Sequence, residues 1–342
     1  MQQTEQDSFN SAVSMISPNI RQMLLKLDEK IKKRTYEIRL RANRPIILYG
    51  SYSSAFFNDD SSTSMVIKNN TVILSMQELA DTFNRICGYS VHSHQNSIIN
   101  GFVTVKGGHR AGIAGTAVCD SSGNITNIRD ISSINIRIAR EVKNCADTLV
   151  SRFFSGEPKS LITAGPPSSG KTTMLRDLIR KLSNNSMGKC YKISVIDERE
   201  ELAAVHSGVP CNDMGYNCDI LNSYPKQTAI MTAIKTLSPQ IIACDEIGTV
   251  NEVEAIRLGV NTGVRFIVTV HASTYNELVS RPQIERLLET YSFDKVVMLK
   301  GGVIPGQIGQ IYDTGDLIDE IYRRRAGIRS DDSLGNQFFA AS

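Results

Sequence analysis

A glycine-rich segment, GPPSSGKTT at residues 165–173, limits the folds open to this chain more than any other stretch. Four of its residues match the pattern G-x-x-x-x-G-K-[ST] without a gap: Gly165, Gly170, Lys171 and Thr172. Glycine at such points lets backbone N–H groups turn inward around phosphate oxygens. An apolar run precedes the segment and a helix-like pattern follows it. We therefore expect a strand, a phosphate-binding loop, and a helix whose N-terminus faces the anion.

The loop residues have expected roles in binding ATP with Mg²⁺. We expect the Lys171 ammonium to reach the β- and γ-phosphates and the Thr172 hydroxyl to ligate the metal. The other positions expected to hold the nucleotide are Gly165, Pro166, Pro167, Ser168, Ser169, Gly170 and Thr173. A Gly/Ser linker is the alternative interpretation, and the strand and helix patterns on either side argue against it.

Two carboxylates end the apolar run IIACDE at residues 241–246. Asp245 suits the role of holding the Mg²⁺ shell. Glu246 is one residue further on and is the candidate to orient and polarise the attacking water. A phosphate-binding loop alone binds nucleotide without cutting it, so this pair is what points to an ATP hydrolase. Solvated acids at a strand end are the alternative interpretation.

Two other strand ends carry candidate groups. The run VIDERE ends in acids, and Glu198 or Asp197 is expected to face the metal or the water, with a structural salt bridge as the alternative. This expectation rests on the tendency of parallel sheets to bind ligands outside the carboxyl ends of their strands. The run RFIVTVHAST places His271 at another such end, where we expect it to sense the γ-phosphate or to relay its presence to a neighbouring group. A lone histidine with a structural role is the alternative there.

The pattern of the chain changes near residue 150 and predicts two domains. Residues 1–150 mix helical and alternating patterns and are expected to form a smaller α+β domain. Residues 151–325 alternate helices with strands that are apolar on both faces, which indicates an α/β core with a mostly parallel sheet. The polar tail at residues 326–342 is expected to be flexible.

Several local patterns are specific enough to predict elements. In the first domain, one helix is expected over residues 19–33 and another from residue 76, with Gly88 ending it. A hairpin is expected over residues 98–118, with its turn at Lys106-Gly107-Gly108. In the second, Thr249 and Glu252 form a capping box that opens a helix, so Glu252 is given no chemical role.

Composition excludes several classes of protein. The 342 residues carry a net charge of +3, which by itself is too small to indicate a nucleic-acid binder. No apolar window approaches the length that spans a bilayer, and the N-terminus lacks the pattern of a signal peptide. The seven cysteines include no CxxC pair, which argues against a zinc ribbon or a disulfide framework. These features predict a cytoplasmic protein with free thiols.

The order of the motifs resembles that of the type II/IV secretion ATPases and pilus-retraction motors, a superfamily with a RecA-like P-loop core. In that superfamily a phosphate loop, an acidic box, a second acidic strand end and a histidine box follow one another, as they do here. More narrowly, the segments EIRLRANRPIILY, GHRAGIAGTAV, NIRIARE and IDERELAAV are similar to the stage III sporulation protein AA family. The resemblance covers residues 20–325.

The resemblance implies further roles and partners. It puts Glu198 in the acidic box and implies that arginines of the N-terminal domain complete the nucleotide site at a domain or subunit boundary. The matching arginines are Arg110, Arg137 and Arg140, with surface or interdomain salt bridges as the alternative. It also implies a homo-oligomer, a hexameric ring, that powers assembly of or transport through a membrane-embedded sporulation channel between mother cell and forespore. Lacking a span of its own, the chain would be recruited to the membrane by partner proteins.

Two other function classes stay open from the sequence. A nucleic-acid-dependent ATPase is one, because RecA-like cores also act on nucleic acids and the chain has basic groups at residues 32–34 and 323–325. The lack of a basic stripe interleaved with aromatic residues argues against it. A nucleotide-gated scaffold with little turnover is the other, and the presence of Glu246 argues against that.

Overall fold

The chain divides into two compact units, each described here by itself. The computed structural model describes residues 5–50, 53–184, 188–302 and 304–326. One unit comprises residues 1–141 and 204–212, and the other comprises residues 142–203 and 213–342. The tail expected at residues 326–342 lies, from residue 327 onward, outside the described residues.

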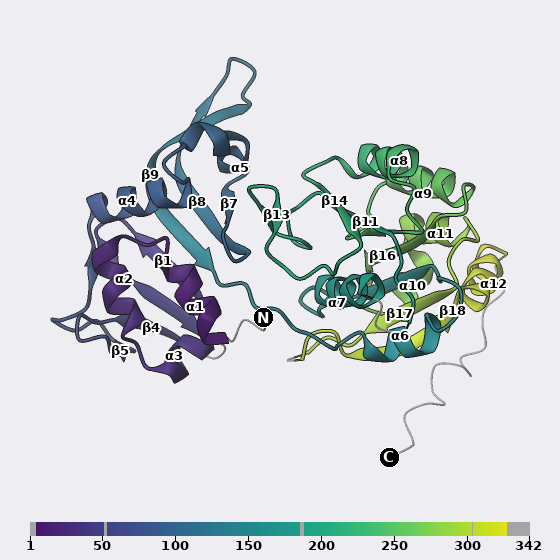
Figure 1. The fold of residues 1–342 in the computed structure, drawn as a ribbon, viewed down its shortest axis with the longest axis horizontal. Helices are drawn as coiled ribbons and strands as arrows, with labels where there is room; N and C mark the ends of the chain where they lie inside the picture. Colours follow the sequence, from purple (N-terminus) through teal and green to yellow (C-terminus); the bar gives the residue numbers. More distant parts are fainter. Residues whose placement is uncertain (1–4, 51–52, 185–187, 303, 327–342) are drawn as a thin grey trace. The chain divides into compact units, whose positions relative to one another are not determined.

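An antiparallel sheet of seven strands forms the first unit, in the order β5-β4-β3-β1-β9-β8-β7 (Figure 1). Its strands are β1 (Thr35–Arg41), β3 (Ile47–Gly50), β4 (Ser54–Phe57), β5 (Thr63–Ser64), β7 (Phe102–Val105), β8 (His109–Cys119) and β9 (Ile125–Arg137). A separate pair is made by β2 (Arg44–Pro45) and β6 (Ile73–Leu74). The predicted hairpin is confirmed, because β7 and β8 pair across a turn in which Gly107 and Gly108 have positive φ.

Five α-helices and one 3₁₀ turn accompany this sheet. They are α1 (Glu5–Val13), α2 (Pro18–Leu25), α3 (Glu29–Arg34), α4 (Met76–Ile86), the 3₁₀ turn Val91–His94 and α5 (Gln95–Ile99). The single helix expected over residues 19–33 was wrong: it is two helices, because the Asp28 carboxylate accepts the N–H of Lys30 and starts a new one. The helix expected from residue 76, with Gly88 ending it, is confirmed as α4, whose last residue is Ile86.

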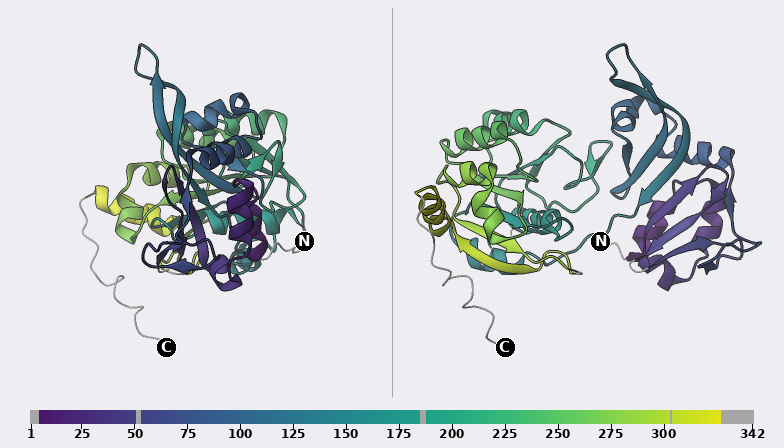
Figure 2. Two further views of the ribbon diagram at one scale, coloured as in Figure 1. Left: turned by 90° about the vertical axis from the view of Figure 1, so that its left-hand side faces the viewer. Right: turned by 180° about the vertical axis from the view of Figure 1, so that it is seen from behind.

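The two longest strands reach beyond the rest of this sheet. Figure 2 shows β8 and β9 continuing as a two-stranded arm. Their register shifts between Ala114 and Thr116, at Gly115. A Cβ on Gly115 would lie 2.6 Å from the Arg129 carbonyl oxygen, so only glycine fits where the strands approach this closely.

A short segment from much later in the chain belongs to the first unit. Residues 204–212 form a two-stranded pair, β12 (Val205–His206) with β13 (Val209–Pro210). This pair contacts β7, and a Cβ on Gly108 would lie 3.3 Å from the Ala204 Cβ. The first unit therefore includes a segment whose two ends both continue into the second.

A second seven-stranded sheet forms the other unit, in the order β14-β11-β15-β16-β10-β17-β18. Its strands are β10 (Leu161–Gly165), β11 (Ile193–Asp197), β14 (Cys218–Asn222), β15 (Ile241–Cys244), β16 (Arg265–His271), β17 (Lys295–Leu299) and β18 (Ile308–Asp313). All neighbours pair in parallel except β17 with β18, which confirms the mostly parallel sheet.

Helices pack on this sheet because its central strands are apolar on both faces and must be covered. They are α6 (Asp147–Phe153), α7 (Lys171–Ser183), α8 (Lys226–Thr236), α9 (Val250–Val260), α10 (Tyr275–Ser280), α11 (Pro282–Leu288) and α12 (Thr314–Arg325). Alternate strand residues such as Ile162, Ile242 and Val268 share one core with α8 to α12. The intervening residues are also buried, and α7 packs against β10 and β16.

The expected cap opens α9. The Thr249 hydroxyl accepts the N–H of Glu252, and the Glu252 carboxylate accepts the N–H of Thr249, which confirms the capping box. Across the part of the chain that the structure describes, no helix combines the length and the apolar character needed to cross a bilayer.

A buried histidine should make the first unit sensitive to acid. His109 on β8 is fully buried, its Nδ1 accepts the N–H of Ala139 at 3.0 Å, and its Nε2 has no hydrogen-bond partner. Burial lowers the pKa of the imidazole to about 4 from 6.5. The neutral form therefore stabilises the fold above pH 6.5, and this contribution, up to about 3 kcal/mol, is lost as the pH falls toward 4.

We expect the midpoint temperature at which the first unit unfolds to decrease as the pH is lowered from 7 to 5. The decrease should be steeper in the wild-type chain than in His109→Gln. Glutamine lacks the group that must bind a proton on unfolding, so the extra slope should disappear. Differential scanning fluorimetry at fixed ionic strength measures both profiles. Parallel profiles would contradict the prediction.

Candidate functional site

The carboxyl ends of four parallel strands meet at one edge of the second sheet, and the candidate site lies there. Strand β10 leads into the phosphate loop, β15 into Asp245 and Glu246, and β16 ends at His271. Because Gly165 pairs in register with His271, the start of the loop and the histidine are neighbours. The fourth strand, β11, brings the VIDERE segment to the same edge.

The phosphate loop has the backbone that its glycines predict. Gly170 caps α7 with a φ of +88°, and Ser168 also lies in the left-handed region. A Cβ on Gly170 would lie 2.2 Å from the Gly306 nitrogen, and the N–H of Gly306 donates to the Ser169 carbonyl at 2.8 Å. The turn between β17 and β18 therefore supports the loop from outside, which is a second reason for glycine at this position.

The charged and hydroxyl side chains of the loop form hydrogen bonds within the site. The Lys171 ammonium donates to the carbonyl oxygens of Gly165 and Pro166, both at 2.9 Å. Burial lowers the pKa of this ammonium, while the carboxylates of Asp245 and Glu246 act in the opposite sense. The Thr172 hydroxyl donates to the Asp245 carboxylate at 2.6 Å. This bond joins the first turn of α7 to the end of β15.

Besides Thr172, two groups hold the two acidic residues beyond β15. The hydroxyl of Thr269, a fully buried residue on β16, donates to the second Asp245 oxygen and accepts the Glu246 N–H at 2.8 Å. The Arg199 guanidinium forms an ion pair with the Glu246 carboxylate. Glu246 itself has a φ of +57°, a conformation that persists only where neighbouring bonds maintain it.

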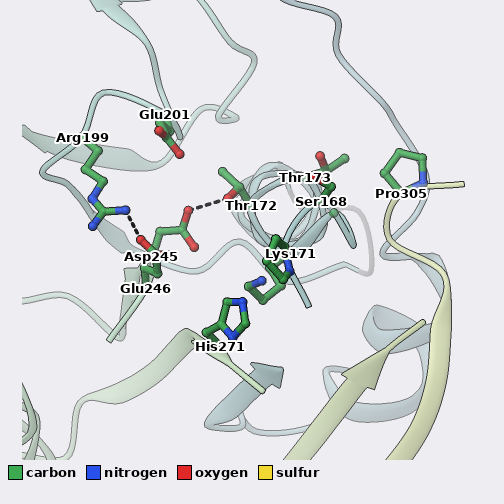
Figure 3. A pocket seen from close by; sticks show the side chains of 12 residues that line it. Ser168, Lys171, Thr172, Thr173, Arg199, Glu201, Asp245, Glu246, His271 and Pro305 are labelled. Carbon is green, nitrogen blue, oxygen red and sulfur yellow. Dashed lines mark hydrogen bonds and ion pairs between the residues drawn. The ribbon is translucent and has the colours of Figure 1, made fainter. Parts of the chain in front are cut away.

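A cavity of about 440 Å³ lies at this edge, and its lining includes Lys171, Asp245 and Glu246 (Figure 3). Of the residues expected from the sequence, it brings together Pro167, Ser168, Gly170, Lys171, Thr172, Thr173, Asp245, Glu246 and His271. Figure 3 shows Asp245 and Glu246 facing the cavity on one side of Thr172, with His271 beside Lys171. The residues Gly165, Pro166 and Ser169 complete the loop, where Ser169 is buried, without lining the cavity.

The VIDERE segment is arranged differently from expectation. Asp197 is buried, and its carboxylate accepts the N–H groups of Glu201, Leu202 and Ala203, so it supports its own loop. Glu198 does not line the cavity and forms an ion pair with Lys226 at 3.3 Å, which matches the salt bridge held open as the alternative.

Sequence reasoning missed three lining residues: Arg199, Glu201 and Pro305. Arg199 lies within the acidic motif itself, so its proximity to the strand ends was a usable signal. Pro305 precedes the supporting glycine of the β17–β18 turn and is remote in sequence from every motif, so no local pattern indicated it.

The three candidate arginines lie in the first unit. Arg110 and Arg137 pair across β8 and β9, and the Arg110 guanidinium stacks 3.5 Å from the Phe102 ring centre. Arg137 is 3.8 Å from Glu37, and Arg140 donates to the carbonyls of Lys32 and Thr35. Their role in completing a nucleotide site stays a prediction.

The chemistry of the cavity fits a nucleotide with Mg²⁺. A hydroxyl and a carboxylate held 2.6 Å apart can supply the few protein ligands that Mg²⁺ takes when phosphates and water complete its shell. A glycine-flanked loop at a helix N-terminus with a lysine suits the phosphates. In the described residues, no cluster of three or more His, Cys, Asp and Glu side chains could hold a metal ion.

The chain is similar to known proteins in sequence and in fold. Stage III sporulation protein AA of Bacillus subtilis (strain 168) is 30% identical over 310 residues, which cover 89% of this chain and 95% of that protein. In fold, the chain is similar to the Legionella pneumophila ATPase DotB, with a TM-score of 0.55 and 16% identity over 90% of this chain and 84% of that one. The pilus retraction motor PilT with bound ADP gives a TM-score of 0.55 and 15% identity, over 86% and 85% of the two chains. The fold is thus the RecA-like fold of these ATPases.

The family itself is identified by sequence. The model of the family described as "Sporulation stage III, protein AA" matches residues 6–317, which is most of the chain. Together with the 30% identity, this match shows that the chain belongs to that family.

Proposed function

We propose that this chain is an Mg²⁺-dependent ATPase. The observation that carries the proposal is the hydrogen bond between Thr172 and Asp245, at the edge of a cavity lined also by Lys171 and Glu246. Lys171 binds the phosphates, Thr172 and Asp245 hold the metal shell, and Glu246 orients the attacking water. His271, next to Gly165, senses the γ-phosphate. When bound, Mg²⁺ would neutralise charge that develops on the phosphate oxygens.

We further propose that hydrolysis drives movement in a sporulation machine. Membership of the family supports a role in sporulation, and the fold supports a motor like the secretion ATPases. The chain would act as a hexameric ring in the cytoplasm. Partner proteins at the membrane would recruit it to the channel between mother cell and forespore, where it energises assembly or transport. One of Arg110, Arg137 and Arg140 would complete the site from another domain or protomer.

Observations on the basic groups disfavour the nucleic-acid alternative. Lys32 is buried and paired with Glu29. In the last turn of α12, Arg324 pairs with Glu320, and Arg325 pairs with two glutamates of the α11 region. These three of the six basic residues are already paired and would have to leave their partners to bind phosphates.

Lys171→Ala should lose most of its affinity for ATP. The lysine supplies the charged hydrogen bond to the phosphates, and losing such a bond costs about 10- to 100-fold in affinity. Fluorescent-nucleotide titration measures the effect. Lys192→Ala, at an exposed position of the same unit, is the matched control and should bind as the wild type does. Equal affinity in both variants would remove the phosphate loop from the proposal.

Glu246→Gln should bind ATP and barely hydrolyse it. The amide keeps the shape of the side chain but cannot take a proton from the water, so turnover should fall about 10²- to 10⁴-fold. Phosphate release and nucleotide binding are measured side by side. Glu254→Gln, which alters an exposed glutamate paired with Arg257, should leave both unchanged. Normal ATP binding together with turnover at the wild-type rate in Glu246→Gln would remove Glu246 from the mechanism.

The mass in solution should increase to that of a ring of six chains when ATP and Mg²⁺ are present with Glu246→Gln, because this variant keeps the triphosphate. Light scattering after size exclusion measures it with and without nucleotide. A monomer under both conditions would contradict the ring and leave the hydrolase proposal in place.

A further inference from the structure

A buried lysine donates a hydrogen bond to the backbone carbonyl of Glu246. Lys226 is the first residue of α8, and its side chain is only 7% exposed. Burial alone lowers the pKa of its ammonium, but nearby groups that include Glu252 and Glu198 outweigh this effect, so the pKa is raised. The group is therefore a permanent cation at neutral pH. A buried charge is costly unless every part of it is paired, so its partners show what it holds in place.

Among the described residues, Lys226 has three bonding partners, and each of them belongs to the candidate site or supports it. The ammonium donates to the Glu246 carbonyl oxygen at 2.9 Å. It lies 3.3 Å from the Glu198 carboxylate and 3.4 Å from the Glu252 carboxylate. Lys226 and Glu198 border a small hollow whose other walls include Asp245 and Glu246, which also line the main cavity.

The same lysine is tied to the turn that follows Glu246. The Glu252 carboxylate accepts the N–H groups of Gly248 at 2.8 Å and of Thr249 at 2.9 Å. Burial raises the pKa of Glu252, but these backbone bonds and Lys226 outweigh it, so the pKa is lowered and the carboxylate stays charged. The carboxylate of Glu252, which forms the capping box of α9, thus also holds the turn that follows Glu246.

Hydrogen bonds therefore hold the Glu246 backbone on both sides of its Cα. Its N–H donates to the Thr269 hydroxyl at 2.8 Å, and its carbonyl accepts from Lys226. These two bonds maintain the left-handed φ of +57°, which points the side chain toward the cavity. Without the lysine, the peptide is free to relax toward a common conformation and turn the carboxylate away.

We infer that Lys226, braced by Glu252, is a positioning residue that sets the direction of the Glu246 carboxylate for hydrolysis. The inference rests on the proposed ATPase activity. It assigns Lys226 no contact with nucleotide, since Lys226 does not line the main cavity. Its loss should therefore affect turnover and leave nucleotide binding intact.

Lys226→Met tests this, because methionine keeps the length and apolar stem and removes the charge. We expect kcat to fall about 10- to 100-fold, as misplacement of a catalytic group does. The dissociation constants for ATP and ADP, measured with fluorescent nucleotides, should stay unchanged. Lys235→Met, which alters an exposed lysine of the same helix, is the matched control and should keep both quantities. Unchanged kcat in folded Lys226→Met would overturn the inference.

A second comparison separates positioning from loss of stability. Lys226→Met leaves Glu252 buried without its cation, which destabilises the fold, whereas Lys226→Met/Glu252→Gln removes both charges. The double variant should regain thermal stability without regaining kcat, since the Glu246 carbonyl still lacks its donor. Should the single variant not fold, the double variant is compared with Glu252→Gln alone. Recovery of kcat together with stability would overturn the inference.

The third comparison asks whether the lysine acts through Glu246. In single-turnover assays, Lys226→Met should cause no further loss when introduced into Glu246→Gln. A loss of equal size in both backgrounds would show an action independent of Glu246 and overturn the inference. The failure of the proposed function is a different result: the wild-type chain itself would not hydrolyse ATP with Mg²⁺.

Discussion

Parallel pairing of β10, β11, β15 and β16 is the constraint on which the site depends. It brings the carboxyl ends of four strands to one edge, so groups that are far apart in sequence become neighbours without long loops. The Thr172–Asp245 bond then joins the first turn of α7, the helix that follows β10, to the end of β15. Because the strands beneath are buried on both faces, the edge is rigid, and a side chain that continues from a strand has little freedom in direction.

Many elements of the candidate site could be predicted from the sequence because they depend on residues that are close together in the chain. The pattern at residues 165–173 specifies a loop and a helix start, and runs such as IIACDE show where a buried strand meets solvent. The Thr249–Glu252 capping box is likewise local, since both partners lie within one helical turn. What escaped prediction depends on distant pairing, such as the support that the β17–β18 turn gives to Gly170.

Glu252 and Lys226 show the limit of local reading most clearly. The capping box explained Glu252 fully, so nothing in the sequence suggested a second use for its carboxylate. Lys226 follows a proline at the start of a helix, a position that usually carries a solvated charge, and only the packing of α8 against β15 and α9 buries it. Likewise, the pattern of residues 19–33 is apolar at helical spacing throughout, and the break came from the capping preference of Asp28.

Arg199 and Lys226 both bind Glu246, and the two interactions differ in how easily they can be broken. Arg199 contacts the carboxylate, and both side chains of this pair are substantially exposed, at 60% and 40%. Exposed pairs contribute little stability, so a competing anion or a bound water can displace the arginine. Lys226 contacts the carbonyl of the same residue and is buried among three partners, so separating it is costly. In the proposed hydrolysis cycle, the carboxylate can therefore exchange its partner while the backbone of Glu246 stays in place.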